Sequence, residues 1–189
     1  MPESKDLITH ARNYLINGNI DNAIEFAQES IQWIQHATNG LHKEILHSYD
    51  MLVSALTHGQ DYISAISVCG RSLNTSIQLT GLDSSETLQN HLHLAYLFSE
   101  IGQYLVAMKH IQAARYIALL LGGESHPEII GILIKIAGIY KSTGNFADAS
   151  LCLNICHERL QVCGDQVKCY SFRLSLLFSV ILNLTCVTS

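Results

Sequence analysis

Proline is almost absent from this chain of 189 residues, and charged residues make up only 14% of it. Proline disrupts a helix everywhere except in its first turn, so a chain with so little of it can be helical almost throughout. The two prolines are Pro2 and Pro127, and Pro127 stands where we expect a new helix to begin. Hydrophobic residues reach 48%, enough to bury a substantial core, and one elongated domain accounts for this length.

Positive charge is also scarce, because 11 lysines and arginines stand against 16 aspartates and glutamates, for a formal net charge of −5. Affinity for phosphates rests on clustered Lys and Arg, so this balance argues against nonspecific binding of nucleic acid. We expect RNA to be bound only weakly, or through other domains of a parent protein. The first residues are polar and acidic, where a signal peptide would be basic and then apolar, so we expect a cytoplasmic location.

Motifs of catalysis are missing too. The sequence has no His-Glu-x-x-His element, no glycine-rich phosphate loop and no nucleophile elbow, and its ten histidines are scattered. Cys152 and Cys156 lie four residues apart near His157 and Cys163, a spacing that a zinc site could use. Small buried thiols are common between helices, and packing is the favoured interpretation. We predict no enzyme, no catalytic residue, no cofactor and no metal.

What the chain does contain is one pattern, repeated four times at an interval of 42 residues. Each copy has a turn residue, a large residue two positions after it, an alanine five positions after it and a large residue four positions before it. In that order the roles are filled by Gly18, Gln60, Gly102 and Gly144; by Ile20, Tyr62, Tyr104 and Phe146; by Ala23, Ala65, Ala107 and Ala149; and by Tyr14, Leu56, Phe98 and Tyr140.

These are the requirements of a helical hairpin: a residue that tolerates unusual backbone angles at the turn, a large residue beside it, and a small one where the helices cross. The sequence therefore predicts an all-α fold, an α-solenoid of four helical hairpins. We expect the repeats at about 4–36, 41–79, 85–121 and 126–162, within residues 1–165. Each hairpin alone would leave one apolar flank in water, so the hairpins must stack to be stable.

The glycine, aromatic and alanine positions resemble tetratricopeptide repeats, most clearly at Gly102, Tyr104 and Ala107. The interval exceeds the usual ~34 residues, and this long form is similar to kinesin light chains and to clustered-mitochondria proteins. The segments that favour the second family are Gly123-Glu124-Ser125-His126-Pro127-Glu128, His93-Leu94-Ala95 and Ala113-Ala114-Arg115-Tyr116. The resemblance covers roughly residues 7 to 165, and it implies a repeat module from the C-terminal part of a large cytosolic protein.

Beyond Gly164 the pattern fails, and residues 166–189 form an apolar tail. Three interpretations stay open: a C-terminal helix that caps the stack as the first helix of an incomplete fifth repeat, a membrane anchor, or a frayed non-native terminus. The apolar run from Leu174 to Val187 is shorter than the ~20 residues of a spanning helix. The anchor therefore ranks last and no membrane insertion is expected, while the tail could support self-association.

Function is expected in the concave groove formed by the first helix of each hairpin. The groove mixes apolar spots, one aromatic residue and charges of both signs, which suits an extended or helical peptide. The alternative is that part of it is only solvated, or is covered by neighbouring domains. By register, the partner-binding candidates are Arg12, Asp50, Ser54, Leu92, Tyr96, Ser99 and Lys141.

Two functions remain open. Resemblance to clustered-mitochondria proteins implies a non-catalytic interaction scaffold that acts in mitochondrial distribution and in handling mRNAs for mitochondrial proteins with the translation machinery. The alternative is a generic peptide-binding adaptor, either a kinesin-light-chain-like cargo adaptor or a co-chaperone. Ile8 and Leu92 stand where a chaperone clamp would have lysines, and Asp50 with Met51 stands where kinesin light chains carry paired asparagines. Neither clamp is present in its usual form.

Overall fold

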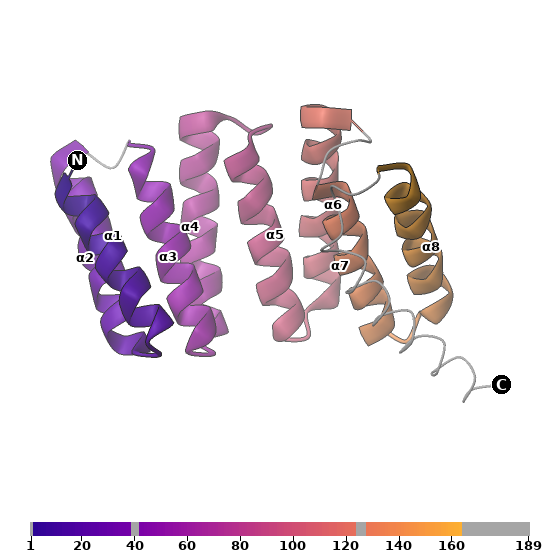
Figure 1. The fold of residues 1–189 in the computed structure, drawn as a ribbon, viewed down its shortest axis with the longest axis horizontal. Coiled ribbons are helices and arrows are strands. Elements are labelled where there is room, and N and C mark those ends of the chain that lie inside the picture. Colours follow the sequence, from indigo (N-terminus) through magenta and orange to yellow (C-terminus); the bar gives the residue numbers. More distant parts are fainter. Residues whose placement is uncertain (1, 39–41, 124–127, 164–189) are drawn as a thin grey trace.

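The computed structural model describes residues 2–38, 42–123 and 128–163, and every regular element within these ranges is a helix. The helices are α1 (Pro2–Ile16), α2 (Ile20–Thr38), α3 (Glu44–His58), α4 (Tyr62–Thr80), α5 (Ser85–Glu100), α6 (Tyr104–Gly122), α7 (Glu128–Ser142) and α8 (Phe146–Cys163). They pair as four antiparallel hairpins that stand side by side in sequence order (Figure 1). The predicted α-solenoid of helical hairpins is confirmed, while the apolar tail lies outside the described residues.

The four turns share one backbone conformation. Gly18, Gln60, Gly102 and Gly144 have positive φ angles of 77°, 60°, 76° and 77°. In the first turn, the N–H of Gly18 donates to the carbonyl of Leu15 at 3.1 Å, and that of Asn19 donates to the carbonyl of Tyr14 at 2.9 Å. Equivalent pairs close the other three turns. This bonding satisfies the last carbonyls of a helix and requires a left-handed residue, which explains the glycines.

The second helices begin where the sequence pattern predicts, at the large residue two positions after the turn. In three hairpins an Asn or Asp side chain caps this start; for example, the Asp61 carboxylate accepts from the N–H of Ser64 at 3.1 Å. Gln103 makes no such bond in the third hairpin. The predicted crossing positions, Ala23, Ala65, Ala107 and Ala149, are all completely buried, because only a methyl group fits where the two helices meet.

The core divides into two apolar clusters. One joins α1 to α4 and takes in Leu94 and Leu97 from α5, and the other joins α5 to α8. Between them lies the interface of α4 with α5, which we call the polar seam. It is defined by Ser72, Ser76, Thr80, Ser84, Thr87 and Asn90. The corresponding interface of α6 with α7, which we call the apolar seam, is defined by Ala114, Ile117, Ala118, Ile129, Ile132 and Leu133.

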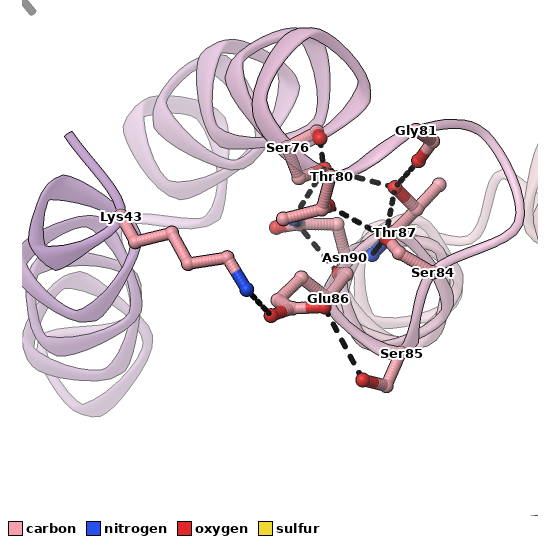
Figure 2. A network of polar contacts seen from close by, with 9 residues as sticks. All are labelled: Lys43, Ser76, Thr80, Gly81, Ser84, Ser85, Glu86, Thr87 and Asn90. Carbon is pink, nitrogen blue, oxygen red and sulfur yellow. Dashed lines mark hydrogen bonds and ion pairs between the residues drawn. The ribbon is translucent and has the colours of Figure 1, made fainter. Parts of the chain in front are cut away.

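The side chains of the polar seam bond mainly to one another, as Figure 2 shows. The Asn90 amide donates to Ser76 Oγ at 3.2 Å, and the hydroxyls of Ser76 and Thr87 lie 3.2 Å apart. The hydroxyls of Thr80 and Ser84 lie 2.7 Å apart, and Ser84 also caps α5 by accepting the N–H of Thr87 at 3.1 Å. Burial of Ser76, Thr80, Ser84, Thr87 and Asn90 is tolerated because each of them finds a partner.

Candidate binding groove

Three clefts follow one another along the face that the first helices share. The cleft between α1 and α3 has a volume of about 500 Å³, that between α3 and α5 about 230 Å³, and that between α5 and α7 about 440 Å³. We call this row of clefts the groove. The two larger volumes lie in the range of small-ligand sites, and the row as a whole suits an extended partner.

Six of the seven predicted binding residues line these clefts. Arg12, Asp50 and Ser54 line the cleft between α1 and α3, whereas Tyr96, Ser99 and Lys141 line the one between α5 and α7. Among the six, Tyr96 leaves 44% of its surface exposed. The seventh, Leu92, is only 2% exposed and packs in the core of the C-terminal cluster. It therefore does not line the groove, and sequence register placed it there wrongly.

The middle cleft has an edge that the sequence analysis missed. Lys43 at the start of α3 and Glu86 in the first turn of α5 line this cleft and form an ion pair of 3.3 Å (Figure 2). A second pair crosses from α1 to α3, between Lys5 and Glu44 at 3.5 Å. The sequence signal for these ion pairs was the presence of opposite charges about one repeat apart, at or next to the starts of successive first helices. The lysine of each pair is well exposed, so both ion pairs contribute little to the stability of the fold. They place charged side chains at the edge of the groove.

Asp50 belongs to the lining of the first two clefts. Together with His47 it lines both of them, and its side chain is half-buried. Burial raises the pKa of the Asp50 carboxyl, against the opposing influence of His93 and His47. Burial likewise lowers the pKa of His93, which Asp50 raises and Lys135 lowers further. In the part of the chain that the structure describes, His93 Nδ1 is buried without a hydrogen-bond partner.

His91 and His110 form a pair between the two helices of the third hairpin. His91 on α5 and His110 on α6 place their Nδ1 atoms 3.0 Å apart, and His110 stacks on Phe98. Burial, with His110 nearby, lowers the pKa of His91 to about 4, so His91 is neutral at pH 7. One ring donates and the other accepts, which joins the two helices of the third hairpin.

Cys69 and Cys156 are buried between helices, and Cys152 is half-buried. Burial raises the pKa of Cys69 and of Cys156 to about 12, so neither thiol is a nucleophile at neutral pH. Cys69 Sγ instead lies 3.6 Å from the carbonyl oxygen of Asn90, beside the polar seam. Within the described ranges no three histidine, cysteine or acidic side chains converge as a metal site would need. In the same ranges no helix has the length and apolar character to cross a membrane.

Solved structures share this architecture at low sequence identity. A putative kinesin light chain with nearly identical tetratricopeptide-like repeats, from "Podosopora anserina", matches 98% of this chain and 96% of its own with a TM-score of 0.71 and 15% identity. The apo form of RapI matches 95% of this chain and 63% of its own with a TM-score of 0.80 and 13% identity. These likenesses establish the fold as tetratricopeptide-like.

Sequence comparison points to one group of proteins. No family model matches the chain. The clustered mitochondria protein homolog of Danio rerio is 25% identical over 72% of the chain, and that of Aedes aegypti is 23% identical over 81%. The chain spans about a tenth of these relatives, 10% and 11% of their respective lengths. The resemblance inferred from the repeats is confirmed: the chain is similar to the clustered mitochondria proteins over most of its length.

Proposed function

We propose that the chain is a non-catalytic interaction scaffold that holds a peptide segment of another protein in its groove. The observation that carries this proposal is the row of three clefts along the first helices. A solenoid presents such a row to an extended or helical segment because each repeat adds one more cleft. The proposed contacts are Arg12, Asp50, Ser54, Tyr96, Ser99 and Lys141.

Tyr96 is the proposed anchor at the C-terminal half of the groove. A tyrosine combines a large apolar ring with a hydroxyl and loses little conformational entropy on binding, so such residues dominate many interfaces. Tyr96 stands between α5 and α7 beside Lys135 and Lys141. A partner segment placed there would bury the ring and meet two positive charges together with the carboxylate of Glu100.

The resemblance to clustered mitochondria proteins supports a role in mitochondrial distribution and in handling mRNAs for mitochondrial proteins together with the translation machinery, in the cytoplasm. The net charge of −5 supports contact with the protein components of such assemblies. Contact with RNA is then indirect, because the chain offers too few cations to compete for phosphates.

The test is recovery of proteins and RNAs from cytosol on the tagged 189-residue chain, with and without nuclease. We expect the set of proteins to survive nuclease, and RNA crosslinks to the purified chain to be weak and lost at high salt. The variant Y96A should deplete those proteins. Y116A is the matched control, because Tyr116 is 62% exposed on α6 and lines none of the three clefts.

Efficient, salt-resistant RNA crosslinks would contradict the protein-contact proposal. Equal recovery by Y96A and Y116A would contradict the assignment of the groove. Selective recovery of motor heavy chains or chaperone C-termini would favour the generic adaptor over a mitochondrial role.

A further inference from the structure

Asp50 differs from the other carboxylates at the entrance to the groove. Glu44 and Glu86 each have a lysine at 3.5 and 3.3 Å. Among the described residues, by contrast, no hydrogen bond or ion pair engages the Asp50 carboxylate, although it is half-buried. Its neighbours act on it only through longer-range electrostatics, from His47 on the same helix and His93 on α5.

The position of Asp50 makes it accessible to a partner. It lines both the cleft between α1 and α3 and the cleft between α3 and α5, so a segment that follows the groove must pass over it. A carboxylate held partly out of water without a counter-ion has lost hydration that it does not recover within its own chain. A positively charged side chain from a partner would restore that interaction.

We propose that Asp50 is the residue of the groove that selects its partner, by pairing with an arginine or lysine side chain of the bound peptide. This inference rests on the proposed function and names the chemistry of the segment that the groove accepts. The overall charge of −5 also attracts a cationic segment over longer distances. The lysines that line these two clefts, Lys5 and Lys43, are already engaged with Glu44 and Glu86.

At neutral pH, Asp50 should also lower the stability of the chain when no partner is bound. Its pKa is raised on folding, so the folded state binds the proton more tightly than the unfolded state does. Its contribution is therefore favourable at low pH and is lost as the pH rises through the folded-state pKa. The titratable groups that act on it are His47 on α3, His93 on α5 and Cys69 on α4, with Lys135 of α7 acting on His93. Lys5 and Arg12 of α1 line the same cleft.

The experiment selects peptides from a random twelve-residue phage library on the immobilised 189-residue chain, in parallel for the wild type, D50N and D83N. Asp83 is an exposed aspartate between α4 and α5 that lines none of the three clefts, so D83N makes the same change in net charge elsewhere. We expect wild type and D83N to enrich peptides with a basic residue at one shared position, and D50N to lose that preference.

Affinities of one synthetic wild-type-selected peptide then measure the pairing. D50N should weaken its binding about tenfold. Replacing the basic residue of the peptide by alanine should abolish the difference between wild type and D50N. In the free chain, D50N should raise the melting temperature at pH 7.

Three results would overturn the inference: enriched peptides without a shared basic position, binding to D50N within twofold of wild type, or a lower melting temperature in D50N together with lost binding, which would make Asp50 structural. These results leave the proposed function standing. A library that yields no enriched peptide on the wild type would contradict the proposed function itself.

Discussion

The polar seam and the apolar seam occupy the same place in successive repeats, yet their chemistry is opposite. Ser76, Thr87 and Asn90 of the polar seam stand one 42-residue interval before Ala118, Ile129 and Ile132 of the apolar seam. Both sets are almost completely buried. The comparison shows that the repeat specifies helix positions and residue sizes, while two different kinds of interaction can hold neighbouring hairpins together.

The two seams should respond differently to the same residue. At these positions the apolar seam buries aliphatic side chains, whereas the polar seam buries side chains that hydrogen-bond to one another. A polar side chain is therefore stabilising in one seam and costly in the other, since a buried polar group without a partner retains its full desolvation penalty.

The largest effect is expected when the amide of the polar seam is copied into the apolar one. I132N should lower the free energy of unfolding by about 4 kcal/mol, because it removes a fully buried aliphatic side chain and introduces an amide among Ile129, Leu133 and Ala118. Urea unfolding followed by circular dichroism measures this change. A loss below about 1 kcal/mol would show that the apolar seam can hydrate, and the contrast between the seams would fail.

Removing the same amide from the polar seam should cost less. N90A should lower the free energy of unfolding by about 2 kcal/mol, because Ser76 loses the donor at 3.2 Å but keeps Thr87 as a partner. The same urea experiment applies, with N74A as a control at an exposed asparagine of α4. If N90A and N74A behave alike, the network contributes nothing to holding α4 against α5.

The polar seam also contains one group that its network does not satisfy. Among the described residues, Ser72 Oγ is buried without a hydrogen-bond partner, and the corresponding residue of the apolar seam is Ala114. S72A should therefore raise the free energy of unfolding by about 1 kcal/mol. The thermal midpoint should rise accordingly. A fall in the midpoint would mean that Ser72 is hydrogen-bonded in solution, and the seam would then be fully paired.

The smallest expected change lies in a turn, away from both seams. Gln60 holds the left-handed conformation that glycine holds in the other three turns, so Q60G should stabilise the chain by about 0.5 to 1 kcal/mol. Differential scanning calorimetry can resolve a shift of this size. G102Q, the reverse change in the third hairpin, should be destabilising to a similar extent. Should both changes lower stability, backbone strain at Gln60 is not the reason.

Much of the backbone was predictable because the repeated residues act locally. A turn glycine, a wedge such as Tyr104 and a crossing residue such as Ala107 each impose one conformation wherever they occur, and four copies reinforce one another. Even Gln60, which breaks the sequence pattern, has the backbone angles that its position predicts. The fold and the location of the groove follow from such local rules.

Side-chain environments were less predictable because they depend on neighbouring helices. Asp50 and Leu92 hold the same register position, yet Asp50 lines two clefts and Leu92 packs in the core. Polarity alone does not decide the outcome, because Ile8 holds the same register position in the first repeat and lines the cleft between α1 and α3. The hydrogen-bond partners of Asn90 likewise depend on how α5 meets α4, which the sequence interval does not encode.

The hydroxyls and the amide between α4 and α5 also restrict the order in which the hairpins of the solenoid can stack. The aliphatic flank between α6 and α7 can accept other aliphatic flanks, whereas the interface of α2 with α3 buries one polar pair, the hydroxyls of Ser30 and Ser48 at 2.8 Å. The second and third hairpins leave polar atoms stranded in any pairing but their own. In a chain of four similar repeats, the central interface is therefore specific for the pairing of the second hairpin with the third.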